Sequence, residues 1–222
     1  MNFAPDPATL APTPLIDSDH PAVVEFSQRA TGANPRELAI SLYYLVRDNF
    51  RYDPYRIDVT PNGMRASRVL EVGYGWCVPK AALLTAVARA RGIPARVGYA
   101  DVRNHLSTER FRELLQTDVY IWHGYTELWL DDAWVKATPA FNLALCERFG
   151  ILPLEWDGRE DSLYHPYDRE GRRHMEYVKQ RGTFDDVPLA QIAADFAEAY
   201  PRWLASTIAD ADFDRDVERE NR

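Results

Sequence analysis

The chain has 222 residues, of which 46% are hydrophobic and 27% charged, so it is long and apolar enough for one domain with a sizeable core, and intrinsic disorder is excluded. Its formal net charge of −8 disfavours a nucleic-acid partner, because binding to phosphate backbones needs clustered Lys and Arg. No basic start followed by an apolar run opens the sequence, and no apolar stretch is long enough to cross a membrane. We therefore expect a cytoplasmic protein without a membrane partner.

The first third of the chain predicts helices. Residues 1–16, rich in Pro and Ala, predict an extended arm, and a helix is expected after the possible caps at residues 17–19. A stronger helix signal begins at residues 34–37, where Asn-Pro-Arg-Glu forms a capping box, and continues as an apolar stripe over residues 38–46. Residues 51–72 are irregular and predict loops with one short helical turn.

The next stretch places a cysteine at the start of a helix. Gly73 and Gly75 interrupt the preceding structure, and Pro79 is tolerated within a helix only in its first turn. An apolar helical pattern then runs to Gly92, which predicts the end of the helix. We therefore expect Cys77 at a helix N-terminus.

Beyond this helix the apolar period changes to that of strands. Residues 94–102 predict a strand, residues 108–116 a short amphipathic helix, and residues 119–130 a long strand. Asp131 and Asp132 predict a tight turn into a partner strand over residues 134–138.

The remainder of the chain gives weaker signals. No regular element is expected between Pro139 and a helix over residues 188–206, which should break at Pro201. The acidic tail from Asp210 is predicted to be frayed. A single domain over residues 1–222 is expected.

Cys77 and Cys146 are the two cysteines, too few for a disulfide framework and wrongly spaced for a zinc site, so we expect no metal and no cofactor. A helix N-terminus lowers the pKa of a thiol, which favours Cys77 as a nucleophile. The Cys77 amide is then a candidate oxyanion donor, and Trp76 could wall the pocket or donate from its indole. The alternative is that Cys77 is a small buried residue at the foot of its helix, as we expect Cys146 to be.

His123 is the best candidate base among five histidines, because it alone lies within a predicted strand. There it should share a face with Tyr125 and Glu127, and Glu127 could orient the imidazole. A lone histidine in such a strand is more often a satisfied core residue. Its pairing with Cys77 favours the catalytic interpretation.

Two runs carry a family resemblance: GYGWCVPKAALLTAVARARGIPARVGY from Gly73 and HGYTELWLDDAWVKATP from His123. They resemble the transglutaminase-like superfamily of papain-like cysteine enzymes, most closely a bacterial branch. The resemblance implies an α+β fold in which the nucleophile helix packs against an antiparallel sheet. It also implies Cys77 as nucleophile, His123 as base, core motifs over residues 73–142, and a family-specific C-terminal extension over residues 143–222.

The third catalytic position departs from the family pattern, which usually has Asp there. Thr138 occupies that place, or Lys136 in an alternative register. Because an orienting acid stabilises the imidazolium, its absence should weaken catalysis unless another group substitutes. Asn142 is a candidate, since papain-type triads use Asn, and Asp157 or Asp161 could also reach the histidine. The alternative for each residue taken singly is an ordinary structural role: Asn142 could cap a turn, and Asp157 could form a turn with the following glycine.

Two functions remain open. The first is thiol-dependent acyl transfer on a peptide or protein amide through a Cys77 thioester, with Gly75 and Trp122 as candidate substrate-binding residues. Hydrolysis is favoured over amine transfer, because no residue reveals a site that excludes water. The second is a catalytically weak or inactive module that binds peptide or protein. A metal-dependent hydrolase is disfavoured, since the sequence has no HExxH motif.

Overall fold

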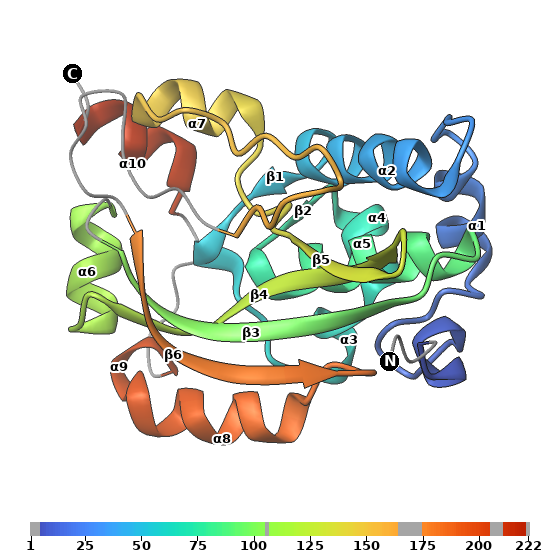
Figure 1. Cartoon of the computed structure of the whole chain (residues 1–222). Helices are drawn as coiled ribbons and strands as arrows, with labels where there is room; N and C mark the ends of the chain where they lie inside the picture. Colours follow the sequence, from blue (N-terminus) through green and yellow to red (C-terminus); the bar gives the residue numbers. More distant parts are fainter. Residues whose placement is uncertain (1–4, 105–106, 164–174, 205–210, 221–222) are drawn as a thin grey trace.

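A four-stranded antiparallel sheet forms the centre of the fold in a computed structural model that describes residues 5–104, 107–163, 175–204 and 211–220 (Figure 1). The helices are α1 Pro21–Ser27, α2 Pro35–Asn49, α3 Pro61–Met64, α4 Ala66–Val72, α5 Cys77–Ala90, α6 Glu109–Leu115, α7 Leu143–Phe149, α8 Leu189–Ala199, α9 Pro201–Leu204 and α10 Phe213–Glu220. The strands are β1 Arg51–Tyr52, β2 Tyr74–Gly75, β3 Ala95–Asn104, β4 Val119–Leu130, β5 Ala133–Ala137 and β6 Met175–Phe184. Short 3₁₀ helices span Pro7–Leu10 and Pro54–Arg56.

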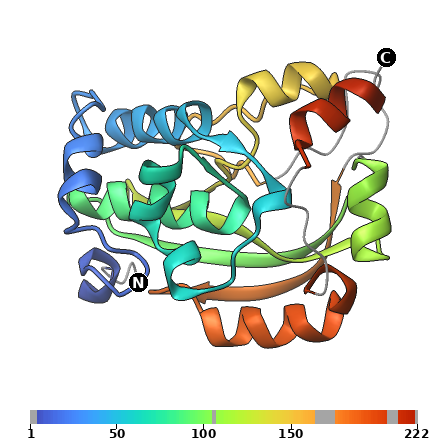
Figure 2. The ribbon, with the colours of Figure 1, turned by 180° about the vertical axis from the view of Figure 1, so that it is seen from behind.

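The strand order of the sheet is β5-β4-β3-β6, and every neighbouring pair is antiparallel. The β4–β5 hairpin turns at Asp131 and Asp132, with φ of 48° and 66°. Positive φ at both central residues is what a tight two-residue hairpin requires, so the predicted turn is confirmed. Helix α5 packs directly against the sheet, and α1, α2 and α4 pack around α5, while α8 lies along the β6 side (Figures 1 and 2). The predicted α+β class, with the cysteine helix packed on an antiparallel sheet, is confirmed.

Helix α5 is the central helix, and every residue from Cys77 to Arg89 is buried. It approaches β4 closely at Gly124, where an added Cβ would lie 3.0 Å from the Val78 Cα. Further along, the Thr126 hydroxyl donates to the Ala81 carbonyl at 2.8 Å. This close fit fixes the start of α5 beside the middle of β4.

The capping box of α2 forms as predicted. The Asn34 Oδ1 accepts from the Glu37 amide at 3.0 Å, and the Glu37 carboxylate accepts from the Ala33 amide at 2.8 Å. The first bond satisfies an N–H group that the first turn of the helix otherwise leaves without a partner, and the second ties Glu37 to the residue before the cap.

Lys80 ties α5 to the far end of α2. Its buried ammonium donates to the carbonyls of Arg47 at 2.9 Å and Phe50 at 2.7 Å. Burial lowers the pKa of Lys80 to about 7, because desolvation disfavours the charged form. The lysine therefore has a structural role in joining the two helices.

The N-terminal region differs from the predicted extended arm. Residues 7–10 form a 3₁₀ helix and Ile16 is fully buried, so this segment contributes to the core. The next helix is capped by His20, whose Nδ1 accepts from the Ala22 amide at 3.3 Å, rather than by residues 17–19. Local propensity identified the helix, but several adjacent polar residues made its cap ambiguous.

The C-terminal half is more regular than predicted. Helix α7 and strand β6 occupy a region for which no element was expected, while the helix broken at Pro201 is confirmed by α8 and α9. The expected frayed tail is wrong for residues 213–220, which form α10; Asp210 itself lies outside the described residues. Arg148 on α7 forms ion pairs with Asp214 at 3.1 Å and Glu218 at 3.0 Å, and these contacts dock the charged helix.

Within the described ranges, no helix has both the length and the apolar character needed to cross a bilayer.

Candidate active site

Cys77 is the first residue of α5, as predicted. Gly73 ends α4 with a φ of 74°, and the two-residue strand β2 then pairs in parallel with β1. Trp76 follows in an extended conformation as the N-cap. Because the start of α5 is held between β2 and β4, the position of the sulfur is determined by packing on both sides.

The Cys77 thiol is buried, with 7% of the residue exposed. Burial raises the pKa of the Cys77 thiol to about 11, although the backbone amides of Gly124, Val78 and Cys77 itself act to lower it. The expected lowering of the pKa by the helix N-terminus is thus present but is outweighed by desolvation. At neutral pH the thiol is protonated in this closed conformation.

A β-bulge positions His123. Ala100 of β3 pairs with His123 and Val102 pairs with Tyr120, so two residues of β4 lie opposite one residue of β3 between these pairs. Trp122 within the bulge has a φ of 59°, an unusual conformation for a bulky residue. Because of the extra residue, Tyr120 and His123 face the same side although they are three positions apart.

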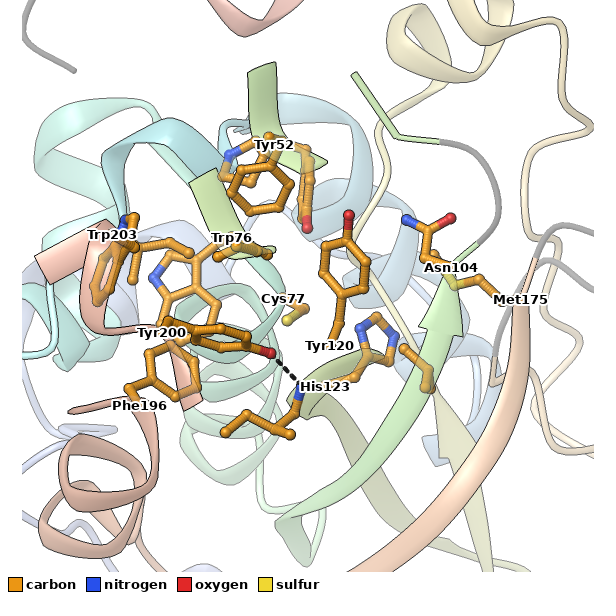
Figure 3. A pocket seen from close by; sticks show the side chains of 16 residues that line it. Tyr52, Trp76, Cys77, Asn104, Tyr120, His123, Met175, Phe196, Tyr200 and Trp203 are labelled. Carbon is orange, nitrogen blue, oxygen red and sulfur yellow. Dashed lines mark hydrogen bonds between the residues drawn. The ribbon is translucent and has the colours of Figure 1, made fainter. Parts of the chain in front are cut away.

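Cys77 and His123 line one narrow cavity at the end of α5 (Figure 3). Its other described lining residues are Tyr52, Pro54, Ile57, Trp76, Val102, Asn104, Phe111, Leu115, Tyr120, Ile121, Met175, Phe196, Tyr200 and Trp203. These residues come from strands β1, β3, β4 and β6, from helices α6, α8 and α9 with the residue between the last two, and from the segments after β1 and before α5. Trp76, for which the sequence predicts a place in the pocket wall, is among these lining residues.

Helices α8 and α9, which we call the cover (residues 189–204), close one side of the cavity. Phe196 packs on Trp76 with ring centroids 5.7 Å apart. The Tyr200 hydroxyl accepts from the Ile121 amide at 2.8 Å and donates to the Val119 carbonyl at 2.9 Å. The cover is therefore hydrogen-bonded to β4 at the bulge that precedes His123.

A polar cluster also fastens the cover to the sheet. Asp195 of α8 accepts from the Trp122 indole at 2.8 Å and forms an ion pair with Arg181 of β6. Arg181 also pairs with Asp101, which accepts from the Trp122 amide at 3.1 Å. Trp122 thus contributes to closure and lies outside the residues that line the Cys77 cavity.

The two candidates for the third catalytic residue make hydrogen bonds to the backbone of other segments. The Thr138 hydroxyl donates to the Leu163 carbonyl at 2.6 Å. The Asn142 side chain accepts from the Tyr52 amide at 3.0 Å, which supports a residue of the wall. Neither Thr138 nor Asn142 is among the residues that line the cavity.

The other acidic candidates have local partners. The Asp157 carboxylate accepts from the Arg159 and Glu160 amides, which is the turn expected as its structural alternative. These bonds lower the pKa of Asp157. Asp161 accepts from the Lys136 amide at 2.9 Å.

The remaining positions considered in the sequence complete the comparison. Glu127 pairs with Arg96 at 2.7 Å. Gly75 lines a separate hollow on the other side of Trp76, and not the cavity that contains Cys77. His105, His165 and His174 lie outside the described residues.

Sequence reasoning missed several residues of the cavity, among them Asn104, Tyr120 and Tyr200. Strict strand alternation places Tyr120 and His123 on opposite faces, so only the bulge brings them together. Tyr200 lies within a predicted helix, just before its break at Pro201, and no local signal connects it with a strand some eighty residues earlier. In Figure 3, Asn104 lies on the same side of the cavity as His123.

Across the described ranges, no group of three or more His, Cys, Asp and Glu side chains has the arrangement of a metal site. A thiol at the start of a buried helix, packed on an antiparallel sheet whose histidine lines the same cavity, is the arrangement of papain-like cysteine enzymes.

Comparison with known proteins identifies the family. The sequence profile of the transglutaminase-like superfamily matches residues 24–139, just over half of the chain. The chain therefore belongs to the transglutaminase-like superfamily. No curated protein sequence matches it.

Two solved structures align with parts or all of the chain. A candidate cysteine protease from Cytophaga hutchinsonii aligns with a TM-score of 0.49 and 19% identity, over 82% of this chain and 47% of that protein. The transglutaminase of red sea bream aligns with a TM-score of 0.43 and 15% identity, over 100% of this chain and 47% of that protein. The chain thus spans about half the length of either.

Proposed function

We propose that this protein catalyses thiol-dependent acyl transfer from an amide, with water as the usual acceptor, so that the net reaction is hydrolysis of a peptide or protein amide bond. The observation that carries the proposal is that Cys77, at the N-terminus of α5, and His123, beside the β4 bulge, line the same cavity. Membership of a superfamily that includes cysteine proteases and transglutaminases supports this chemistry.

The protonated thiol determines the first step. With its pKa near 11, Cys77 reaches the substrate as a thiol, so His123 takes the proton as the sulfur attacks the carbonyl carbon. The carbon–sulfur bond forms while the carbonyl π electrons move to oxygen, and the Cys77 amide at the helix start donates to that oxyanion. The intermediate collapses to a thioester, and His123 returns the proton to the leaving amine.

Deacylation repeats these steps with water. His123 accepts a proton from water, the hydroxyl oxygen bonds to the thioester carbon, and the carbon–sulfur bond breaks to release a carboxylic acid and the thiol. Asn142 and Thr138 then act as positioning residues, since Asn142 holds Tyr52 at the cavity wall and Thr138 anchors the segment after β5. Gly75 would extend the site through the hollow beyond Trp76, while Trp122 would act through the closure of the cover.

Acetylation by p-nitrophenyl acetate tests this proposal directly. Intact mass and peptide mapping should locate one acetyl group on Cys77, followed by its loss through hydrolysis. Cys77→Ala should abolish the modification, and the matched variant Cys146→Ala should retain it. His123→Gln should slow acetylation by about 100-fold or more, the usual contribution of a positioned base. Equal modification of both cysteines, or none, would contradict the proposal.

A peptide-binding module without turnover is the second candidate. The buried, protonated thiol favours it, as does the absence of a carboxylate among the described residues that line the cavity. In that case Cys77→Ala should bind peptides as the unaltered protein does, and no acetyl-enzyme should form.

A further inference from the structure

The cavity beside Cys77 has an apolar, strongly aromatic lining. None of its described lining residues is Asp, Glu, Lys or Arg. Seven are aromatic apart from His123: Tyr52, Trp76, Phe111, Tyr120, Phe196, Tyr200 and Trp203. In a chain with 27% charged residues, a lining without charged side chains favours an apolar occupant over a charged one.

The aromatic rings are arranged as two walls around the sulfur. Phe196 lies 5.7 Å from Trp76, 5.2 Å from Tyr200 and 5.8 Å from Trp203, measured between ring centroids. In the view of Figure 3, this cluster lies on one side of Cys77, while Tyr120 and His123 lie on the other.

Further ring contacts lie behind the second wall, which contains Tyr120 and His123. Phe111 packs against Tyr120 at 5.6 Å and against Tyr55 at 5.9 Å. Both walls are therefore held by neighbouring rings. Because the cavity is narrow, a planar apolar group would enter as the cover opens and would then meet rings that are already ordered.

We infer that the substrate carries an aromatic or large aliphatic group next to the reacting carbonyl, and that charged groups at this position are rejected. This inference rests on the proposed function, since it names the acyl group that Cys77 accepts. An apolar group gains by leaving water, and a phenyl ring also gains from edge and offset contacts with aromatic walls. A carboxylate or ammonium group would lose its hydration and find no opposite charge in the described lining.

Acylation by a set of p-nitrophenyl esters measures this selectivity. The 3-phenylpropionyl, acetyl and glutaryl esters present an aromatic, a small and an anionic acyl group, and rates with free N-acetylcysteine correct for intrinsic reactivity. After this correction, the aromatic ester should acylate Cys77 about 10- to 100-fold faster than the acetyl ester. The glutaryl ester should be the slowest. Equal corrected rates, or a preference for the anionic ester, would overturn the inference and leave the acyl-transfer proposal intact.

A charge placed in the lining provides a second measurement. Ile57 lies in a loop, is only partly buried and lines the cavity, whereas Val59 is similarly buried and does not line it. Ile57→Lys should improve the corrected rate of the glutaryl ester relative to the aromatic one by about 5-fold or more, because a nearby cation attracts the carboxylate. Val59→Lys should preserve the original order. The same shift in both variants would show that the cavity lining does not set the selectivity.

Binding without chemistry separates this inference from the function on which it rests. In the Cys77→Ala protein, N-acetyl-phenylalaninamide should bind at least about 10-fold more tightly than the corresponding lysine and glutamate amides, as measured by calorimetry. If no ester acylates Cys77 but this order of affinity holds, acyl transfer is refuted and the aromatic specificity stands. If none of the amides binds, the specificity is refuted.

Discussion

The protonation state of Cys77 gives a sharp test of the mechanism. Only the thiolate reacts with iodoacetamide, and a pKa of about 11 leaves about 10⁻⁴ of the thiol ionised at pH 7. A thiol with the ordinary value of 9.0 would be about 10⁻² ionised, so burial alone should slow alkylation of Cys77 by about 100-fold. The rate should then rise about tenfold for each unit of pH up to about pH 10, with no plateau near neutrality.

The cover offers a perturbation with a predicted magnitude. Tyr200→Phe removes the hydroxyl that bonds to Ile121 and Val119, which should favour opening by about 1–3 kcal/mol. Alkylation of Cys77 should accelerate by about 5- to 150-fold at pH 7.5, because the thiol becomes hydrated more often. Tyr44→Phe is the matched control, since its hydroxyl bonds to Glu155 far from the cavity.

The assay is the rate of carbamidomethylation of each cysteine, followed by peptide mass mapping between pH 6 and 10. A plateau below pH 7 in the unaltered protein would refute the protonated-thiol mechanism and indicate a thiolate–imidazolium pair. A Tyr200→Phe protein that reacts no faster than Tyr44→Phe would refute the role assigned to the cover.

Two further predictions concern buried polar groups. Lys80 has a pKa of about 7 when folded and an ordinary value of 10.5, so the unfolded chain binds more protons between these values and stability should rise with pH. Urea unfolding should show that the free energy of unfolding of the unaltered protein rises between pH 7 and 9.5, and that Lys80→Met removes about 2–4 kcal/mol of this rise. The control Lys179→Met, which replaces an exposed lysine, should keep the full rise. Thr138→Asp, which restores the usual family acid, should destabilise the protein by about 2–4 kcal/mol, since its carboxylate would face the Leu163 carbonyl. Its acetylation by p-nitrophenyl acetate should not accelerate, and Thr138→Ser should remain stable; a faster Thr138→Asp protein would place this residue in the catalytic group.

The sequence predicted those elements that are determined by interactions between residues close together in the chain. The box at Asn34 and Glu37, the start of α5 at Cys77 and the turn at Asp131 and Asp132 each depend on a few neighbouring residues. The strand carrying His123 was also predicted, because its apolar pattern persists over its full length.

Long-range contacts account for what the sequence did not predict. Strand β6 shifts register against β3 at two places, which interrupts the alternation by which strands are recognised. Helix α10 is highly charged, and it is held both by ion pairs with Arg148 of α7 and by the buried side chains of Phe213 and Val217. The pKa of Cys77 went against the local expectation for the same reason, since residues from the distant cover help to bury the thiol.

The cover lies well beyond residue 139, where the match to the superfamily ends. A protein trimmed to that boundary would lack Phe196 and Tyr200, together with β6 along the outer edge of β3. The Cys77 thiol would be more exposed to water, one wall of its cavity would be missing, and a long strand would be open to pairing with other chains. The residues that match the family and the residues that build the cavity therefore have different limits in this protein. Expression for assays requires the chain through at least α10.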